Sequence, residues 1–230
     1  MHRFLRLTIL LAGMFVATGS HAAGQPFTGT EDQLGPEVPQ PIEFPHNRHA
    51  GKGEVIDSGA QDPTQKYVGM EINCMYCHTY ARRSMVSGIP PLRKCIGCHQ
   101  SIESVREAPR IKKLFEYWEG TDGKDAQKPV PWLKVHDLPD FVRFNHERHI
   151  QRFYFQQGKV TQDEAGGNDG IREVCSYCHG DIAAKNATVA RRQKPITMGW
   201  CANCHQKDHA VDATGTETAR GPNDCFTCHK

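Results

Sequence analysis

The clearest pattern of apolar and polar residues is a helical stripe near the middle of the chain. Between Pro109 and Gly120, apolar residues recur with the spacing of one helix face. These residues are Ile111, Leu114, Phe115 and Trp118. The stripe predicts one helix whose apolar face covers the interior of the protein rather than a partner. Strand patterns are sparse elsewhere, and Arg152–Phe155 is the best of them.

A second apolar run, at residues 7–17, lies near the N-terminus behind two basic residues, Arg3 and Arg6. A small-x-small triplet at 20–22 then has the form of a cleavage site. The run is too short to span a bilayer comfortably, and no other stretch of the sequence could span one. We therefore expect residues 1–22 to be a cleaved signal peptide and the mature protein to be periplasmic. The alternative is that the leader is kept as a short anchor.

Apolar side chains alone would build only a thin core. They make up 38% of the 230 residues, below the usual share for a globular domain, whereas Gly (21) and Pro (14) are plentiful. Cofactors or cross-links are therefore expected to stabilise a loop-rich chain. The formal charge of +2 falls to 0 when Arg3 and Arg6 leave with the signal peptide. No basic patch with interleaved aromatic residues indicates a nucleic-acid partner.

All ten cysteines lie in five copies of the motif C-x-x-C-H. The cysteines are Cys74 and Cys77, Cys95 and Cys98, Cys175 and Cys178, Cys201 and Cys204, and Cys225 and Cys228. This is the attachment signature of haem c, because two thiols on one helical turn can bond to the two vinyl groups of a haem. The imidazole that follows can then reach the iron. The sequence predicts five covalently bound haems, with the proximal ligands His78, His99, His179, His205 and His229.

Other uses of paired cysteines explain the pattern less well. Five disulfides would be the simplest expectation for an exported protein, but a disulfide does not require a histidine after every pair. Zinc sites need a second half at some distance, and a thioredoxin-type motif would occur once. With 13 histidines in 230 residues, a histidine after all five pairs would arise by chance on the order of once in a million cases. Five haems would also supply the apolar mass that the side chains lack.

Each haem iron has a second axial position, which His or Met fills in electron-transfer haems and which stays open where substrate binds. Six histidines remain outside the motifs and the leader: His46, His49, His136, His146, His149 and His209. Four of them form two copies of F-x-H-x-x-H, at 44–49 and 144–149. Two haem motifs follow each copy. We interpret this as an internal duplication, with the fifth motif as a C-terminal addition.

The F-x-H-x-x-H element resembles that of small multihaem cytochromes of the c3 and c7 type, in which the two histidines are distal ligands to two different haems. The resemblance implies that the first histidine of each copy, His46 or His146, serves the first haem motif after it. It also implies that the second, His49 or His149, reaches a neighbouring haem and ties the two together.

The remaining distal ligands stay open at this point. His136 lies in a linker, where a ligand role is favoured over a surface position, and His209 lies among charged neighbours, where the two roles are equally understandable. Met198, shortly before Cys201, is a possible thioether ligand that would raise the haem potential. A packing role explains this methionine equally well.

The fold class expected from these patterns is a multihaem cytochrome c, loop-rich and with mainly short α-helices. It would contain two duplicated c7-like two-haem modules plus a fifth haem. The expected segments are a signal peptide at 1–22, an extended arm at 23–43, haem module 1 at 44–100, a connector with the helix at 101–140, haem module 2 at 141–206 and a fifth-haem tail at 207–230.

Four stretches go beyond generic haem binding: "YCHTYARRS", "GIPPLRKCIGCH", "WLKVHDLPDFVRFNHERH" and "PITMGWCANCH". In this order they resemble the pentahaem cytochrome c subunit of alternative complex III, a bacterial quinol-oxidising complex, over about residues 40–206. The resemblance implies an electron-transfer subunit and not an enzyme by itself. It would take electrons from membrane and iron–sulfur subunits and pass them to a monohaem cytochrome c or an oxidase. That family is commonly held by an N-terminal membrane helix, so a chain with a cleaved leader would join the inner membrane through its partners.

Two other functions remain at this stage. A free periplasmic shuttle of the c7 type, feeding reductases, would suit a protein that is soluble after signal removal. A multihaem nitrite or hydroxylamine enzyme would need one five-coordinate haem. The pentahaem nitrite reductases mark that haem with Lys in place of the motif His, and all five motifs of this chain end in His.

Overall fold

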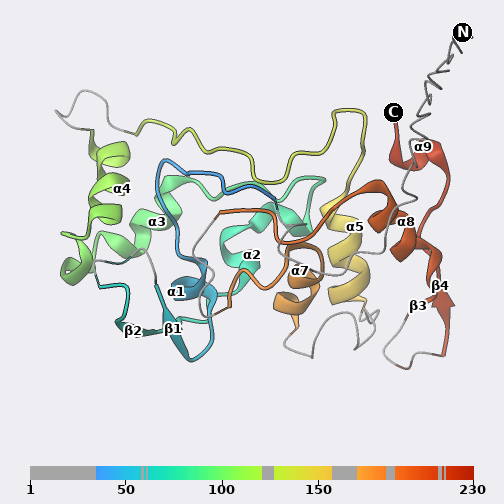
Figure 1. The fold of residues 1–230 in the computed structure, drawn as a ribbon, viewed down its shortest axis with the longest axis horizontal. Coiled ribbons are helices and arrows are strands. Elements are labelled where there is room, and N and C mark those ends of the chain that lie inside the picture. The colour runs from blue at the N-terminus through green and yellow to red at the C-terminus, as the bar shows by residue number, and fades with distance from the viewer. Residues whose placement is uncertain are drawn as a thin grey trace, which may run out of the picture.

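The computed structural model describes residues 35–57, 60, 62–120, 127–156, 170–184, 190–211, 214 and 216–230. The expected signal peptide and the arm up to residue 34 lie outside them. The described chain is loop-rich, with short helices and two small sheets (Figure 1). This is the character that we expected from the sequence, whereas the cytochrome class itself stays a prediction. No helix within the described ranges is long and apolar enough to cross a bilayer.

The secondary structure consists of short elements. The helices are α1 (His46–Ala50), α2 (Cys74–Cys77), α3 (Leu92–His99), α4 (Pro109–Glu119), α5 (His146–Ile150), α7 (Ile171–His179), α8 (Met198–Gln206) and α9 (Cys225–Cys228). Two 3-10 turns, η2 (Thr79–Arg82) and η3 (Glu103–Val105), and a π-helical turn, η4 (Gln151–Phe155), accompany them. Strands β1 (Glu54–Ile56) and β2 (Lys66–Val68) pair antiparallel, as do β3 (His209–Ala210) and β4 (Thr218–Ala219).

Helix α4 confirms the helix predicted from the apolar stripe. It begins at Pro109, whose fixed φ suits a first helical position. It ends before Gly120, which has the positive φ of 77° that glycine adopts without strain. Ile111 and Trp118 pack against a cluster of buried residues beside α3. The members of this cluster are Ile42, Ile96, Leu114, Phe115 and Val130. The apolar face of α4 therefore covers the interior next to the second haem motif, as predicted.

The predicted strand at Arg152–Phe155 is wrong. The segment continues α5 as the π-helical turn η4. The side chain of Asn145 accepts a hydrogen bond from the Arg148 N–H and so starts α5. Once a helical turn exists, adding residues to it costs less than starting a strand that has no neighbour to pair with. The aromatic residues pack from this helical surface instead, and the Phe153 ring lies 5.6 Å from that of His209.

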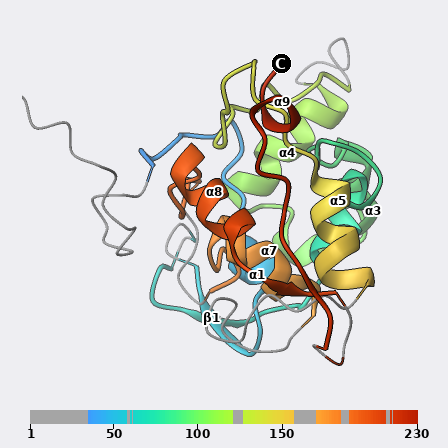
Figure 2. The ribbon, with the colours of Figure 1, turned by 90° about the vertical axis from the view of Figure 1, so that its right-hand side faces the viewer.

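The elements follow one long axis in Figure 1. Helix α4 lies at one end, α1, α2 and α7 lie in the middle, and α8 and α9 lie at the other end together with β3 and β4. Figure 2 looks along this axis from the α9 end and again shows α7 near the centre.

The segments expected from the sequence contact one another across their boundaries. In the arm, Gly35 N–H donates to the Arg192 carbonyl at 2.8 Å, so the arm reaches the second module. Helix α5 of the second module packs on η2 of the first. His146 N–H donates to the Met85 carbonyl at 3.2 Å across that contact. The duplicated halves therefore pack against each other.

Candidate functional site

Every C-x-x-C-H motif lies on a helix. The motifs form all of α2 and α9 and the C-terminal parts of α3, α7 and α8, with the histidine within one residue of the helix end. Polar side chains start three of these helices: Asn73, Thr197 and Asp224 accept hydrogen bonds from backbone N–H groups of the first turn. The two thiols of each motif therefore lie on one helical turn, and none of the ten cysteines forms a disulfide in the structure.

The first three motif helices are neighbours. Lys94 of α3 lies over the Tyr76 ring of α2, with its Nζ 4.2 Å from the ring centroid. Helix α2 contacts α7. A hydrogen bond from Cys175 of α7 lowers the pKa of Cys74 of α2 to about 7. In space, the first motif (α2) therefore lies between the second (α3) and the third (α7).

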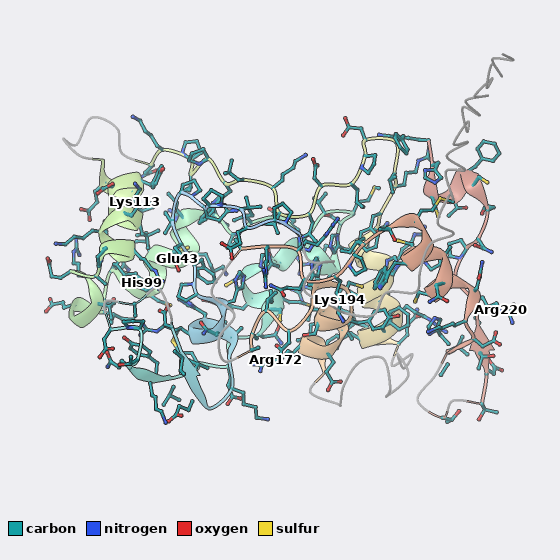
Figure 3. The ribbon with its side chains drawn as sticks, viewed as in Figure 1. Glu43, His99, Lys113, Arg172, Lys194 and Arg220 are labelled. Atoms are coloured by element: carbon teal, nitrogen blue, oxygen red, sulfur yellow. The ribbon has the colours of Figure 1, made fainter. Side chains whose placement is uncertain are left out.

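The other two motif helices continue the same row. Tyr177 of α7 and Trp200 of α8 have ring centroids 5.6 Å apart. Burial and then the nearby Cys228 thiol of α9 raise the pKa of Cys201 of α8. The order along the long axis is therefore α3, α2, α7, α8 and α9, as the labels in Figure 1 show. Figure 3 shows His99 of α3 toward the α4 end of this row and Arg220, just before α9, at the opposite end.

Three motif histidines face a histidine from an F-x-H-x-x-H copy. Two imidazoles that bind one metal ion from opposite sides, each through a nitrogen at about 2 Å, hold their ring centroids about 6.3 Å apart. The observed centroid separations are 6.1 Å for His49 and His99, 6.2 Å for His146 and His179, and 6.1 Å for His149 and His205. These separations fit two axial ligands with an iron between them. The rings of His146 and His179 are also nearly parallel, at 3°.

His46 lies near His78, the remaining motif histidine of the first module. Burial, then the nearby His78, and then His49 lower the pKa of His46 to about 4. Burial likewise lowers the pKa of His179 to about 3. Both rings are therefore neutral at neutral pH, and the neutral imidazole is the form that binds a metal. Each F-x-H-x-x-H copy thus lies beside two different motifs, and that its histidines bind two haems stays a prediction.

The Nδ1 atoms of five histidines in these pairs lie within hydrogen-bond distance of backbone carbonyl oxygens. The pairs are His78 with Gly88 (2.7 Å), His49 with Pro45 (3.0 Å), His146 with Met85 (2.8 Å), His149 with Asn145 (2.8 Å) and His205 with Pro222 (2.7 Å). A carbonyl only accepts, so Nδ1 carries the proton and Nε2 keeps its lone pair. This is how metal-binding histidines are oriented in proteins. The motifs alone did not reveal these acceptors.

The phenylalanine of each F-x-H-x-x-H copy holds both histidines of that copy. The Phe44 ring stacks on His49, with centroids 4.4 Å apart and planes at 25°, and meets His46 edge-on at 4.8 Å. Phe144 repeats both contacts in the second copy, at 4.7 and 4.8 Å. The contacts explain why the phenylalanine recurs in the sequence.

A buried polar network supports the first copy. Asn47 and Asp57 are fully buried. Asn47 Nδ2 donates to the Ile56 carbonyl at 2.6 Å, which joins α1 to β1. Asp57 accepts two hydrogen bonds from Arg110 Nη1 at 2.7 and 2.8 Å, which joins β1 to α4, and lies 3.6 Å from Arg48. The network fixes α1, and with it His46 and His49. Hydrophobic patterning gave no sign of it.

His136 lies against a motif histidine but too close for a shared iron. Its Nε2 is 3.2 Å from Nδ1 of His179, and the two ring centroids are 4.5 Å apart. In two other motif histidines, His78 and His205, Nδ1 is bound to a carbonyl oxygen, which only accepts. By analogy we assign the proton of this hydrogen bond to His179, with His136 as the acceptor. His136 then takes the place that a carbonyl oxygen takes at His78 and His205.

His209 and Met198 lie apart from the imidazole pairs. His209 is buried, with its Nε2 2.9 Å from the Cys204 carbonyl and its ring against Phe153. Met198 is 73% exposed at the start of α8. The structure therefore places three of the six candidate histidines at ligand-pair separation from a motif histidine and His46 near His78. His136 contacts His179 at a shorter distance, and His209 lies apart from the pairs.

The described ranges contain no cluster of three or more His, Cys, Asp or Glu side chains that could hold a metal by themselves. A haem iron needs only two protein ligands, because the porphyrin supplies four nitrogens. Comparisons with known proteins found no protein family that matches the chain and no curated protein that is similar to it.

Proposed function

We propose that the protein is a periplasmic pentahaem c-type cytochrome that transfers electrons. The observation that carries the proposal is the row of five C-x-x-C-H helices, in which three imidazole pairs have the separation of two axial ligands. The motif is the attachment signature of haem c. Histidines on both sides of an iron are typical of haems that transfer electrons rather than bind substrate.

The chain would hold each haem through three of its own groups. Each thiol of a motif adds across one vinyl double bond, the sulfur to one carbon and the hydrogen to the other, so nothing leaves. The motif histidine would be one protein ligand of the iron, and His46, His49, His146 or His149 would be the second at four of the sites. When bound, haem supplies one-electron redox chemistry at its iron. The carbonyl acceptors and the two phenylalanines keep the imidazoles in place.

The two histidines of each copy connect neighbouring sites in the row. His49 faces the second motif, while His46 lies beside the first. His146 and His149 face the third and the fourth motif in the same way. A three-residue spacing on a short helix therefore fixes the position of one site relative to the next. Close and fixed spacing is what transfer between neighbouring haems requires.

We further propose that the protein serves a quinol-oxidising complex of the alternative complex III type. The sequence resemblance supports this role. Membrane and iron–sulfur subunits would take two electrons and two protons from each quinol. The protein would receive the electrons one at a time and pass them to a monohaem cytochrome c or an oxidase. Purification from native membranes, with identification of the subunits that co-purify, tests the assignment. Recovery of most of the protein alone in the soluble periplasm would contradict it and would favour the free shuttle.

Intact mass tests haem attachment directly. The native protein should weigh as much as the chain without residues 1–22 plus five haems, because every motif has both thiols. Changing Cys225 and Cys228 together to serine should reduce the count to four, since the exposed fifth motif can be lost without unfolding the row. A native mass that equals the polypeptide alone would rule out the proposed function.

Replacing His136 with phenylalanine should raise the reduction potential of one haem and leave the spin state of all five unchanged. The variant removes the hydrogen-bond acceptor His136 Nε2, which lies 3.2 Å from His179 Nδ1. Without this hydrogen bond, the His179 imidazole would donate less electron density to the iron. His136→Gln, whose carbonyl can accept, should restore much of the potential. Redox titration followed by optical spectra measures both variants. A new high-spin haem in His136→Phe would instead identify His136 as a distal ligand.

A further inference from the structure

The fifth motif differs from the other four in what faces its histidine. Among the residues that the structure describes, the only ring against His229 is that of Phe141, at 5.7 Å between centroids and 37° between planes. The surrounding contacts are backbone contacts. Val142 bridges to His229, and Arg143 N–H donates to the Cys228 carbonyl at 2.8 Å. The segment just before the second F-x-H-x-x-H copy therefore holds α9 in place without presenting an imidazole to it.

The histidines of both copies are already paired with other motifs. His146 and His149, the ones nearest in sequence to this segment, face His179 and His205. The first copy lies with the first and second motifs, at the other part of the row.

The two histidines left over are also engaged away from α9. His136 Nε2 faces His179 in the middle of the row. His209 Nε2 lies 2.9 Å from the Cys204 carbonyl oxygen, and its Nδ1 is buried without a hydrogen-bond partner in the described part of the chain, away from the exposed surface that α9 forms. Strand β3, which carries His209, lies at the lower edge of the molecule in Figure 1, whereas α9 lies at the upper edge. Figure 2 again shows α9 at the top, beside the C-terminus.

The methionines do not replace these histidines in the structure. Met198 points to solvent, being 73% exposed, and Met70, Met75 and Met85 lie near the first motif. In the ranges that the structure does not describe, the sequence has His or Met only at Met1, His2, Met14 and His21. All four lie within the expected signal peptide.

The fifth motif is also the most exposed of the five. Cys225 is exposed and Phe226 is 85% exposed, so α9 forms a surface at the end of the row. A small molecule could approach a haem there without displacing a buried element. At the paired sites, by contrast, a second imidazole occupies the position opposite the motif histidine.

We propose that the chain supplies no distal ligand to the haem of the fifth motif, and that this terminal haem has a sixth coordination position open to small neutral ligands of the carbon monoxide class. The proposal rests on the proposed function, because it requires haem at all five motifs. A five-coordinate ferrous haem binds carbon monoxide, whereas a haem with two bound imidazoles does so only when one of them is displaced.

The test is a carbon monoxide titration of the full-length holoprotein after reduction. We expect a difference spectrum that corresponds to one haem of five, and one high-spin haem of five in the oxidised protein. The Cys225→Ser, Cys228→Ser double variant should keep four haems and lose the carbon monoxide spectrum. Persistence of that spectrum with four haems would place the open position at another motif and overturn the proposal.

The main alternative is that Met198 is the distal ligand of the fifth haem, and the Met198→Leu variant tests it. The variant should bind carbon monoxide as the native protein does. A native protein with five haems that binds none would overturn the inference, and binding that appears only in Met198→Leu would identify Met198 as the distal ligand. Neither result would affect the proposed function. A protein without haem would instead refute the proposed function itself.

Discussion

Replacing His49 with alanine should leave all five haems attached and make one more of them high-spin. In the proposed cytochrome the thiols would hold the haem covalently. Loss of the His49 imidazole, whose ring centroid lies 6.1 Å from that of His99, would therefore open the iron without releasing the cofactor. Replacing His46 should do the same to a different haem, that of the first motif. Magnetic circular dichroism or electron paramagnetic resonance of the oxidised protein counts the high-spin haems.

The double variant decides whether the two histidines serve one haem or two. If His46 and His49 bind different irons, their joint replacement adds two high-spin haems, and carbon monoxide binding rises by two equivalents. If the double variant adds only one, the histidines compete for one site and the proposed bridging role is wrong. His136→Phe is the matched control, because it removes an imidazole from the same row and should add none.

Replacing Asp57 with alanine should lower the free energy of unfolding by about 3–5 kcal/mol, the usual cost of removing one partner from a buried ion pair. Asp57 is fully buried and accepts two hydrogen bonds from Arg110, while Arg48 lies 3.6 Å away. Removal of the Asp57 carboxylate leaves the largely buried Arg110 guanidinium paired with Glu43, whose Oε1 lies 2.6 Å from Arg110 Nη2. Because that partner persists, we expect the effect at the lower end of the range. Denaturant unfolding followed by far-ultraviolet circular dichroism measures it.

Glu54→Gln is the control for this variant. Glu54 lies in the same strand region, but its ion pair with Lys66 at 3.0 Å is exposed. Breaking an exposed pair changes stability by only about 0–1 kcal/mol. Equal effects for the two variants would show that the Asp57 network does not stabilise the protein. An Asp57 effect without a change in the haem of His49 would show that α1 keeps its position without the network.

The sequence predicted those features of the fold that depend on neighbouring residues. The spacing from Pro109 to Gly120 predicted α4, and the cysteine spacing predicted one helical turn for each motif. The aromatic run at Arg152–Phe155 misled the prediction, because a helix already begun at Asn145 outweighed its preference for strand. Local composition cannot show which element a segment continues.

The features of the candidate site that depend on distant contacts did not follow from the sequence. The repeated F-x-H-x-x-H marks four histidines as expected distal ligands, and the ring separations of three of them are compatible with that hypothesis. The contact between Cys74 and Cys175, however, joins residues from opposite halves of the chain. The approach of His136 to His179 likewise depends on how the connector crosses the second module. No spacing rule encodes such contacts, because they arise from the packing of whole segments.

The order of the motif helices shows how the duplicated halves are joined. The first motif of one half (α2) contacts the first motif of the other half (α7). The second motifs of the two halves, on α3 and α8, lie on the outer sides of this contact. This is the isologous contact of a symmetric homodimer, in which the same patch is used on both sides. A two-haem ancestor that paired with itself before its gene was duplicated and fused would produce this order. The fifth motif then breaks the equivalence and gives the row two chemically different ends. In the proposed function, an electron donor and an electron acceptor would therefore not compete for the same surface.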